Sequence, residues 1–332
     1  MLGHELELAA RQVLDQFRFV SPADSVRPLG NLGGFSGAAL WRVEGGTGPL
    51  CLRAWPPREN SAEHLAWIHH WMQRARASGL QFVPAAFATV RHATVVEHAG
   101  RLWDLTAWMP GRADFHERPT PERLQAASTA LALLHVAWAK EASQTGRCPA
   151  LARRQELVHV WSTVAQATSG LLQQSADPAW PWAQRARSLL LGRVDWVTRA
   201  LAPWTDRHFT LHPCLCDIWH DHVLFEGDTV SGLIDYGGLK IDHPAVDLAR
   251  MLGSLIEDDE HLWEIGLDAY SRVQPLATEE RGFIRMLDQT GTVLGMVTWL
   301  KWLYCEGRAF ENRQAAADRL AKLVERVEGW RK

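Results

Sequence analysis

The chain has 332 residues and a formal net charge of −3, from 35 basic and 38 acidic side chains. This length accommodates two domains or one large two-lobed unit, and the near-neutral charge argues against a nucleic-acid partner, which favours a basic face. The chain also has 17 Trp beside 3 Tyr and 10 Phe, an unusual excess of indoles for which either core packing or a binding site is the explanation.

The sequence contains no feature typical of export or of membrane insertion. Residues 1–7 lack the basic and apolar regions of a secretory signal, and no run of about 18 apolar residues predicts a membrane span. The cysteines are odd in number and scattered, at positions Cys51, Cys148, Cys214, Cys216 and Cys305. This pattern is typical of reduced thiols and predicts a cytoplasmic protein without a membrane partner.

The first third of the chain reads as a small sheet with two helices. Apolar spacing predicts an amphipathic helix over 5–18, and a helix over 61–77 with Ser61 as its N-cap. A glycine-rich hairpin over 30–37 stands among the predicted strands, which cover residues 26–29, 39–43, 50–55, 93–98 and 102–108.

The rest of the chain is mainly helical, with a compact strand–turn segment near 215–240. Helical spacing predicts helices over residues 121–135, 152–172, 180–201, 245–255, 258–272, 278–303 and 313–330. The order indicates an α+β fold with two lobes: a small mixed sheet lobe over 1–110, which we expect to bind nucleotide, and a larger helical lobe over 111–332.

One segment carries the strongest indication of chemistry. A polar loop at 211–222 is followed by a short strand, a tight turn, a second strand and Asp235 within Ile234-Asp235-Tyr236-Gly237. Such a hairpin places Asp217 and Asp235 at one edge. Two carboxylates held in this way suit divalent metal binding and the acceptance of a proton from a hydroxyl.

This segment resembles the catalytic core of the aminoglycoside phosphotransferase/choline kinase-like family, which are relatives of protein kinases. Their loop reads roughly His-Gly-Asp, four residues, Asn, a strand, a turn and Ile-Asp-aromatic-Gly. The resemblance implies a bilobal protein-kinase-like fold, with Asp217 accepting the proton of the substrate hydroxyl and Asp235 holding a metal. It also implies that Asp247, in a Pro-x-x-Asp-Leu-Ala segment, supports the loop.

The resemblance extends over about residues 26–255 and implies a nucleotide site. Arg53 matches the basic residue that touches the phosphates, and Glu63 matches its ion-pair partner on the following helix. The further residues implied for nucleotide binding are those of the glycine-rich turn and the inter-lobe hinge, namely Gly33, Gly34, Ser36, Trp108 and Met109.

Two positions depart from the family pattern. Leu215 stands where the family has a His that buttresses the loop, and His222 stands where it has a metal-binding Asn. An imidazole suits Mg²⁺ less well than an oxygen ligand does, which brings Mn²⁺ into consideration. Asp221, next to His222, is an alternative oxygen ligand.

The sequence therefore predicts an ATP- and Mg²⁺-dependent kinase that phosphorylates a hydroxyl of a small molecule: a sugar, an aminoglycoside or an amino alcohol. Two alternatives stay open. Leu215 and His222 fit a kinase-like nucleotide-binding protein without phosphoryl transfer, and the density of His and Asp at 212–222 fits a metal-dependent hydrolase. Neither the acceptor nor the oligomeric state follows from the sequence, although Trp263, Trp299 and Trp302 are candidates for an acceptor pocket or for core packing.

Overall fold

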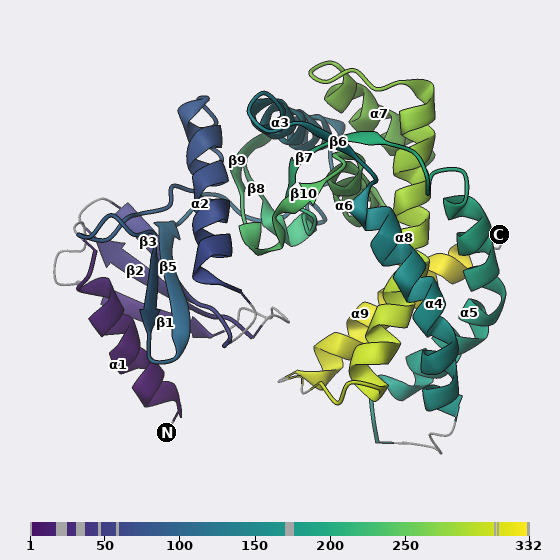
Figure 1. Cartoon of the computed structure of the whole chain (residues 1–332), viewed down its shortest axis with the longest axis horizontal. Coiled ribbons are helices and arrows are strands. Elements are labelled where there is room, and N and C mark those ends of the chain that lie inside the picture. Colours follow the sequence, from purple (N-terminus) through teal and green to yellow (C-terminus); the bar gives the residue numbers. More distant parts are fainter. Residues whose placement is uncertain are drawn as a thin grey trace. The chain divides into compact units, whose positions relative to one another are not determined.

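The structure is a computed structural model that describes residues 2–17, 25–30, 37–45, 48–57, 60–169, 176–308, 310 and 312–330. Its strands are β1 Ser25–Gly30, β2 Ala39–Gly45, β3 Gly48–Ala54, β4 Val95–His98, β5 Arg101–Ala107, β6 Gln144–Gly146, β7 Phe209–Cys214, β8 Val223–Glu226, β9 Thr229–Leu233 and β10 Lys240–Asp242 (Figure 1).

Helices dominate the second half of the chain. The α-helices are α1 Leu2–Leu14, α2 Ala62–Ala77, α3 Pro121–Ala139, α4 Pro149–Ser169, α5 Trp180–Leu201, α6 Ala245–Ile256, α7 Glu260–Ser271, α8 Thr278–Tyr304 and α9 Arg313–Gly329. Short 3₁₀ turns cover His220–His222 and Tyr236–Gly238. The predicted α+β class, with a sheet first and helices after it, is confirmed.

The N-terminal sheet has five strands in the order β1-β2-β3-β5-β4, and every pairing is antiparallel. The small sheet lobe of the predicted fold is thus an antiparallel sheet. β3 begins three positions after the end of β2, and β5 begins three positions after the end of β4. Connections this short allow only antiparallel pairing, whereas parallel pairing needs a crossover of a dozen or more residues.

The two faces of this sheet have different characters because side chains alternate along each strand. On one face, apolar side chains form a core with α1; they include Val13, Trp41, Val43, Leu50, Leu52, Trp103 and Leu105. The opposite face of the two central strands carries Cys51, Arg53, Asp104 and Thr106 in facing pairs. One face therefore stabilises the fold, and the other presents polar groups toward α2.

Helix α2 begins where the sequence predicts. Ser61 has an extended backbone, and its side chain accepts a hydrogen bond from the backbone N–H of His64 at 3.1 Å. Such a cap satisfies one of the otherwise unpaired N–H groups of the first turn and contributes about 1 kcal/mol. Residues Leu65, Ile68 and Met72 are buried, which gives α2 the apolar face that fixes it against the rest of its unit.

The chain forms two compact units, each assembled from several segments. The first contains residues 1–141, 217–239 and 268–274, and the second contains 142–216, 240–267 and 275–332. In the second unit, α8 packs against α4, α5, α6 and α9, and a small sheet has the order β10-β7-β6. The division into consecutive lobes at residue 110 differs from these units and stays a prediction.

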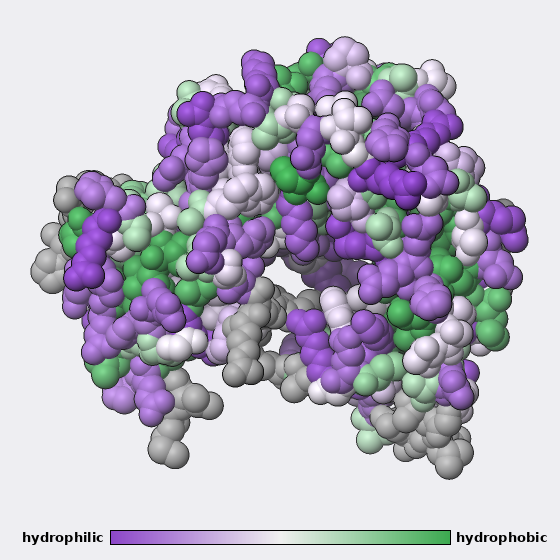
Figure 2. Space-filling view, in the orientation of Figure 1, coloured by the Kyte–Doolittle hydropathy of each residue, from purple (hydrophilic) through white to green (hydrophobic). Residues whose placement is uncertain are grey.

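Among the described residues, no helix is long and apolar enough to cross a bilayer. Figure 2 shows one face of the molecule, on which hydrophilic residues predominate and hydrophobic residues lie in separate areas.

Gly111 provides a test of how the segment after β5 packs. Its φ is +91°, and a Cβ at this position would lie 2.7 Å from the carbonyl oxygen of Phe225 in β8. Left-handed backbone costs a non-glycine residue about 1–2 kcal/mol, and steric overpacking adds about 1–3 kcal/mol. We therefore expect Gly111→Ala to lower the free energy of unfolding by about 2–5 kcal/mol in urea titrations.

Gly100 is the matched control for this prediction. Its φ is +69°, but nothing lies within 4 Å of the position that a Cβ would take, so Gly100→Ala tests backbone strain without a clash. We expect Gly100→Ala to lose only about 1–2 kcal/mol. Equal losses in the two variants would contradict the close packing of residue 111 on β8.

Candidate active site

The β8–β9 hairpin brings together residues that the sequence predicts to be catalytic. Val223 faces Leu233 at the open end of the hairpin, and the backbone N–H of Ile234 donates to the carbonyl of His222 at 3.0 Å. His222, just before β8, therefore lies beside Asp235, just after β9. A two-residue turn at the other end is enough to fix this arrangement.

Asp235 is fixed by a backbone turn and by an ion pair. Its φ is +60°, a left-handed conformation that Asp tolerates better than most residues, and its carboxylate accepts from the backbone N–H of Gly237 at 3.4 Å. Arg53 of β3 donates an Nη1–H to the same carboxylate oxygen, Oδ1, at 2.9 Å. The sequence did not predict this contact between two residues that it assigned separately to phosphate and to metal.

The charge state of Asp235 follows from these neighbours. Burial by itself would raise the pKa of this carboxyl, but the guanidinium of Arg53 outweighs burial and lowers the pKa to about 2. The carboxylate is thus ionised at neutral pH. Its side chain is 43% exposed, so it presents a hard anionic oxygen to solvent.

Asp217 lies in the loop before the hairpin, and its side chain is exposed. Its carbonyl accepts a hydrogen bond from Nδ1 of His222 at 2.9 Å, which ties this loop to the hairpin. Immediately upstream, the buried carboxylate of Asp247 accepts from the backbone N–H groups of Leu215 and Cys216, both at 2.6 Å. The Asp247 contacts thus restrain residues 215 and 216 within the second compact unit, and the His222 contact restrains Asp217 within the first.

His222 does not present a lone pair to a cation in this arrangement. A carbonyl can only accept, so Nδ1 of His222 carries the proton, and Nε2 is the acceptor in the neutral ring. The indole N–H of Trp219 donates to Nε2 at 2.8 Å, while the Asp235 carboxylate is 3.6 Å from the same nitrogen. Asp221 is exposed, with its carboxylate 3.5 Å from Nε2 of His220.

The predicted hinge packs on the same hairpin. The indole of Trp108 is covered by the Arg42 guanidinium at 5.1 Å from the ring centroid, and Met109 is buried. A Cβ at Gly232 of β9 would lie 2.8 Å from Cβ of Met109, so Gly232 permits this close contact. The segment that the sequence assigns to nucleotide and the segment assigned to chemistry therefore belong to one compact unit.

The predicted ion pair between Arg53 and Glu63 is not formed among the described residues. Glu63 lies in the first turn of α2, where it is exposed, and hydrogen bonds from its own backbone N–H and from Ser61 lower the pKa of its carboxyl. Its position favours interaction with the helix dipole, while Arg53 pairs with Asp235 instead. The residues Gly33, Gly34 and Ser36 lie outside the described residues.

Asp104, a buried acid next to Arg53 in the sheet, was not identified from the sequence. Asp104 faces Arg53 across the β3–β5 pair, and it contacts Trp55 and His69. The only sequence signal was its position, because it is an acid flanked directly by Trp103 and Leu105 within a predicted strand.

The indoles suggested for an acceptor pocket have packing partners. Trp263 is fully buried, and the guanidinium of Arg285 lies 4.1 Å from its ring centroid. Trp299 and Trp302 pack edge to face at 5.2 Å, and Trp299 is 9% exposed. These contacts account for Trp263 and Trp299 as core residues, and Trp302 is the most exposed of the three.

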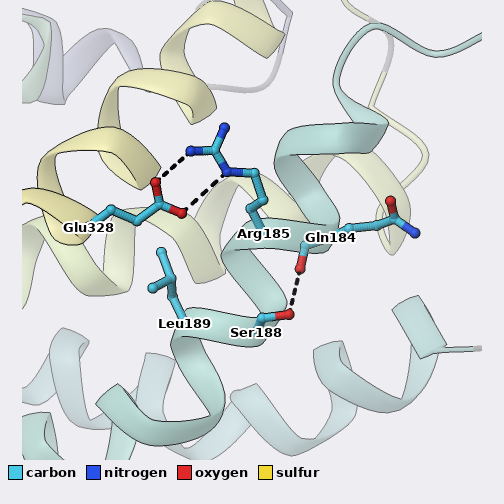
Figure 3. Close-up of a pocket in the computed structure, with 5 residues that line it drawn as sticks. All are labelled: Gln184, Arg185, Ser188, Leu189 and Glu328. Carbon is cyan, nitrogen blue, oxygen red and sulfur yellow. Dashed lines mark hydrogen bonds and ion pairs between the residues drawn. The ribbon is translucent and has the colours of Figure 1, made fainter.

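A surface depression in the second unit is unrelated to these motifs. It is lined by residues of α5 and α9, namely Gln184, Arg185, Ser188, Leu189 and Glu328 (Figure 3). Arg185 and Glu328 form a two-point ion pair, at 3.2 and 2.5 Å, which satisfies their charges. The depression therefore offers no unpaired charge from these two side chains to a ligand.

Comparison with known proteins gives a family. A family model described as "Phosphotransferase enzyme family" matches residues 27–284. A homoserine kinase from Rhodopseudomonas palustris is 28% identical over 189 residues, which cover 55% of this chain and 52% of the relative. The chain spans between 28% and 52% of the length of the curated relatives it matches.

Two solved structures show the same fold across almost the whole chain. A microcompartment-associated aminopropanol kinase has a TM-score of 0.65 at 16% identity, covering 97% of this chain and 96% of its own. The AMP complex of a spectinomycin phosphotransferase has a TM-score of 0.68 at 9% identity, covering 97% and 98%. At these identities the likeness establishes the fold.

The lowered pKa of Asp235 predicts a specific acid dependence of stability. Because its pKa when folded, about 2, is below the ordinary value near 3.9, ionised Asp235 stabilises the fold above about pH 4. This contribution is lost as the pH falls toward 2. We expect the free energy of unfolding to fall less steeply between pH 4 and 2 in Asp235→Asn than in the wild type.

Asp228→Asn, in the exposed turn of the same hairpin, is the control for loss of a carboxylate. It should keep the wild-type slope in the same urea titrations. Parallel pH profiles for the wild type and Asp235→Asn would show that Arg53 does not stabilise the ionised form.

Proposed function

We propose that this chain, which belongs to the phosphotransferase enzyme family, is a small-molecule kinase that transfers the γ-phosphoryl group of ATP to a hydroxyl group. The observation that carries the proposal is the meeting of Arg53, Asp235 and the Asp217 loop on one hairpin within one compact unit. A phosphate-binding cation, a metal-binding carboxylate and a proton acceptor are the groups that phosphoryl transfer requires.

Asp217 is the residue we assign to the acceptor. Its exposed carboxylate orients the substrate hydroxyl and accepts its proton while the hydroxyl oxygen forms a bond to the γ-phosphorus and the bond from that phosphorus to ADP breaks. The products are a phosphate ester, ADP and a proton. The hydrogen bond from Nδ1 of His222 to the Asp217 carbonyl ties the loop backbone to the hairpin, which favours an ordered position for Asp217 before substrate binds.

Arg53 and Asp235 are the residues we assign to the phosphates and to Mg²⁺. The exposed, ionised carboxylate of Asp235 fits a hard cation that prefers oxygen ligands. When bound, Mg²⁺ supplies neutralisation of charge on the phosphate oxygens. Arg53 provides the fixed positive charge, and Trp108 and Met109 on the hinge are assigned to the nucleotide base.

The acceptor we propose is a small hydroxyl compound that also carries an amino group. Support comes from the homoserine kinases, which resemble this chain over part of their length. Sugars and aminoglycosides are the other acceptors in this family's range that an activity panel should include. We also propose a cytoplasmic location, supported by five cysteines that are all free in the structure.

A second candidate function is nucleotide binding without phosphoryl transfer, and the engagement of His222 favours it. With Nε2 of His222 occupied by the Trp219 indole, one position that the resemblance assigns to metal binding contributes no ligand. A hydrolase centred on the histidine-rich loop has less support. Nδ1 of His212 lies 2.8 Å from the carbonyl oxygen of Pro213, and Nε2 of His222 accepts from the Trp219 indole, so both imidazoles already have protein partners.

Asp217→Asn separates these functions. If Asp217 accepts the proton, the variant should lose about 10²- to 10⁴-fold in kcat while binding ATP as the wild type does. Turnover of ATP with homoserine, aminopropanol, sugars and aminoglycosides is the measurement, and Asp228→Asn is the control. Undiminished turnover in Asp217→Asn would exclude the assigned role, and ATP binding without turnover in the wild type would establish the second candidate.

Trp219→Phe tests whether the indole withholds His222 from metal. The change removes the N–H that occupies Nε2 while keeping an aromatic ring. Because the change frees the Nε2 lone pair and imidazole suits Mn²⁺ better than Mg²⁺, we expect the preference for Mn²⁺ over Mg²⁺ to rise. Titration of both ions in the presence of ATP measures it.

The matched control is Trp182→Phe on α5, in the other compact unit, which should leave the metal preference unchanged. An unchanged preference in Trp219→Phe would mean that His222 stays outside the metal site even when its lone pair is released.

A further inference from the structure

A buried acid lies on the sheet face that carries Arg53, and the proposed mechanism leaves it without a role. Asp104, in the middle of β5, is 3% exposed. A carboxylate taken out of water costs several kcal/mol unless charges and hydrogen bonds compensate it. Its neighbours in the strand, Trp103 and Leu105, belong to an apolar core. A carboxylate buried at this position therefore needs specific charged or hydrogen-bonding partners.

Two aromatic side chains hold one oxygen of Asp104. The indole N–H of Trp55 donates to Oδ2 at 2.5 Å, and Nε2 of His69, from α2, lies 3.7 Å from the same atom. Trp55 and His69 are themselves buried, at 6% and 3% exposure. Burial alone would raise the pKa of Asp104, but His69, Arg53 and Trp55 together lower it, so the group is an anion.

The same cluster surrounds Arg53. Asp104 and Arg53 are directly opposed in the β3–β5 register, which places their side chains on one face at neighbouring positions. The guanidinium of Arg53 lies 4.8 Å from the ring centroid of Trp55, a cation–π contact. The charge of Asp104 acts with that of Asp235 to raise the pKa of Arg53, against the effect of burial.

We propose that Asp104 is the positioning anion for Arg53, and that it takes the part which the family resemblance assigned to Glu63 on α2. Trp55 and His69 orient Asp104, and the ring of Trp55 also contacts the Arg53 guanidinium. Helix α2 thus contributes through the imidazole of His69 rather than through a carboxylate. The inference rests on the proposed function, since Arg53 is assigned there to the nucleotide phosphates.

The different exposure of Asp235 and Asp104 supports this role. Asp235 is partly exposed and is assigned to a cation, so its contact with Arg53 has to yield when phosphate and metal bind. Asp104 is buried, and its partners are on the sheet and on α2, so its field acts on Arg53 in every state. Trp55 also contacts the Asp235 turn, because a Cβ at Gly237 would lie 2.8 Å from the indole edge.

The test is a double-variant cycle on ATP affinity. The Kd of ATP with Mg²⁺ is measured by calorimetry for the wild type, Asp104→Asn, Arg53→Met and the double variant. We expect Asp104→Asn to weaken ATP binding about tenfold or more, and to weaken it no further when Arg53 is already Met. If Asp104→Asn weakens ATP binding tenfold when Arg53 is present and not when it is Met, Asp104 acts through Arg53. A general loss of stability would weaken binding in both cases.

Asp288→Asn is the matched control, because Asp288 is also a buried acid paired with an arginine, Arg326, but lies in the other compact unit. It should lose stability and keep the wild-type Kd for ATP. Trp55→Phe, which keeps the ring and removes the donor to Asp104, provides a milder variant if Asp104→Asn does not fold. We expect it to weaken ATP binding several-fold with Arg53 present and not with Arg53→Met.

The outcomes are distinguishable. Wild-type ATP affinity in Asp104→Asn, or in Trp55→Phe should the first variant not fold, would overturn the positioning role and leave the proposed function intact. An equal loss with and without Arg53 would also overturn it. A folded wild-type protein that binds no ATP with Mg²⁺ would overturn the proposed function and this inference together.

Discussion

The ion pair between Arg53 and Asp235 is the contact on which the rest of the candidate site depends. It joins residues 182 positions apart in the chain, one on β3 and one at the end of β9. Because the guanidinium outweighs the effect of burial, it keeps Asp235 ionised at any pH near neutrality. Under the proposed function this ion pair would also couple the two ligands, because a phosphate would compete with Asp235 for Arg53 and a cation would compete with Arg53 for Asp235. Binding of either ligand would then release a partner for the other.

The loop before Asp217 is held by backbone hydrogen bonds. Leu215 is buried where the family pattern has a His, and Cys216 has a φ of +61°, which costs a side chain of this kind about 1–2 kcal/mol. Two hydrogen bonds to the Asp247 carboxylate, at about 1.5–3 kcal/mol each, are enough to offset that strain. The departure at Leu215 thus leaves the loop fixed, because the restraint comes from Asp247 rather than from the side chain at 215.

Much of the fold was predictable because it follows from local patterns. Helix α2 and its Ser61 cap, and the strand–turn–strand unit before Asp235, have strong signals in spacing and turn residues. Strand β6 was missed since three residues with two exposed side chains carry no periodicity. The family resemblance assigned Glu63 as the partner of Arg53, whereas in the structure Arg53 pairs with Asp235 and faces Asp104 across two strands. Register depends on which residues meet across the β3–β5 pair, and a single sequence does not reveal it.

The excess of tryptophan acquires a second explanation beyond core packing. An indole N–H donates and never accepts or titrates, so it fixes an acceptor in one orientation at every physiological pH. Trp55 does this for Asp104 and Trp219 for His222, while Trp330 donates to Asp258 in the other unit. A serine or histidine in these places would add a rotatable or titrating group to a site whose charges must stay constant. Beside Arg53, where a buried acid and an imidazole are held in fixed orientations, a permanent donor on a rigid ring is therefore the physically suited partner.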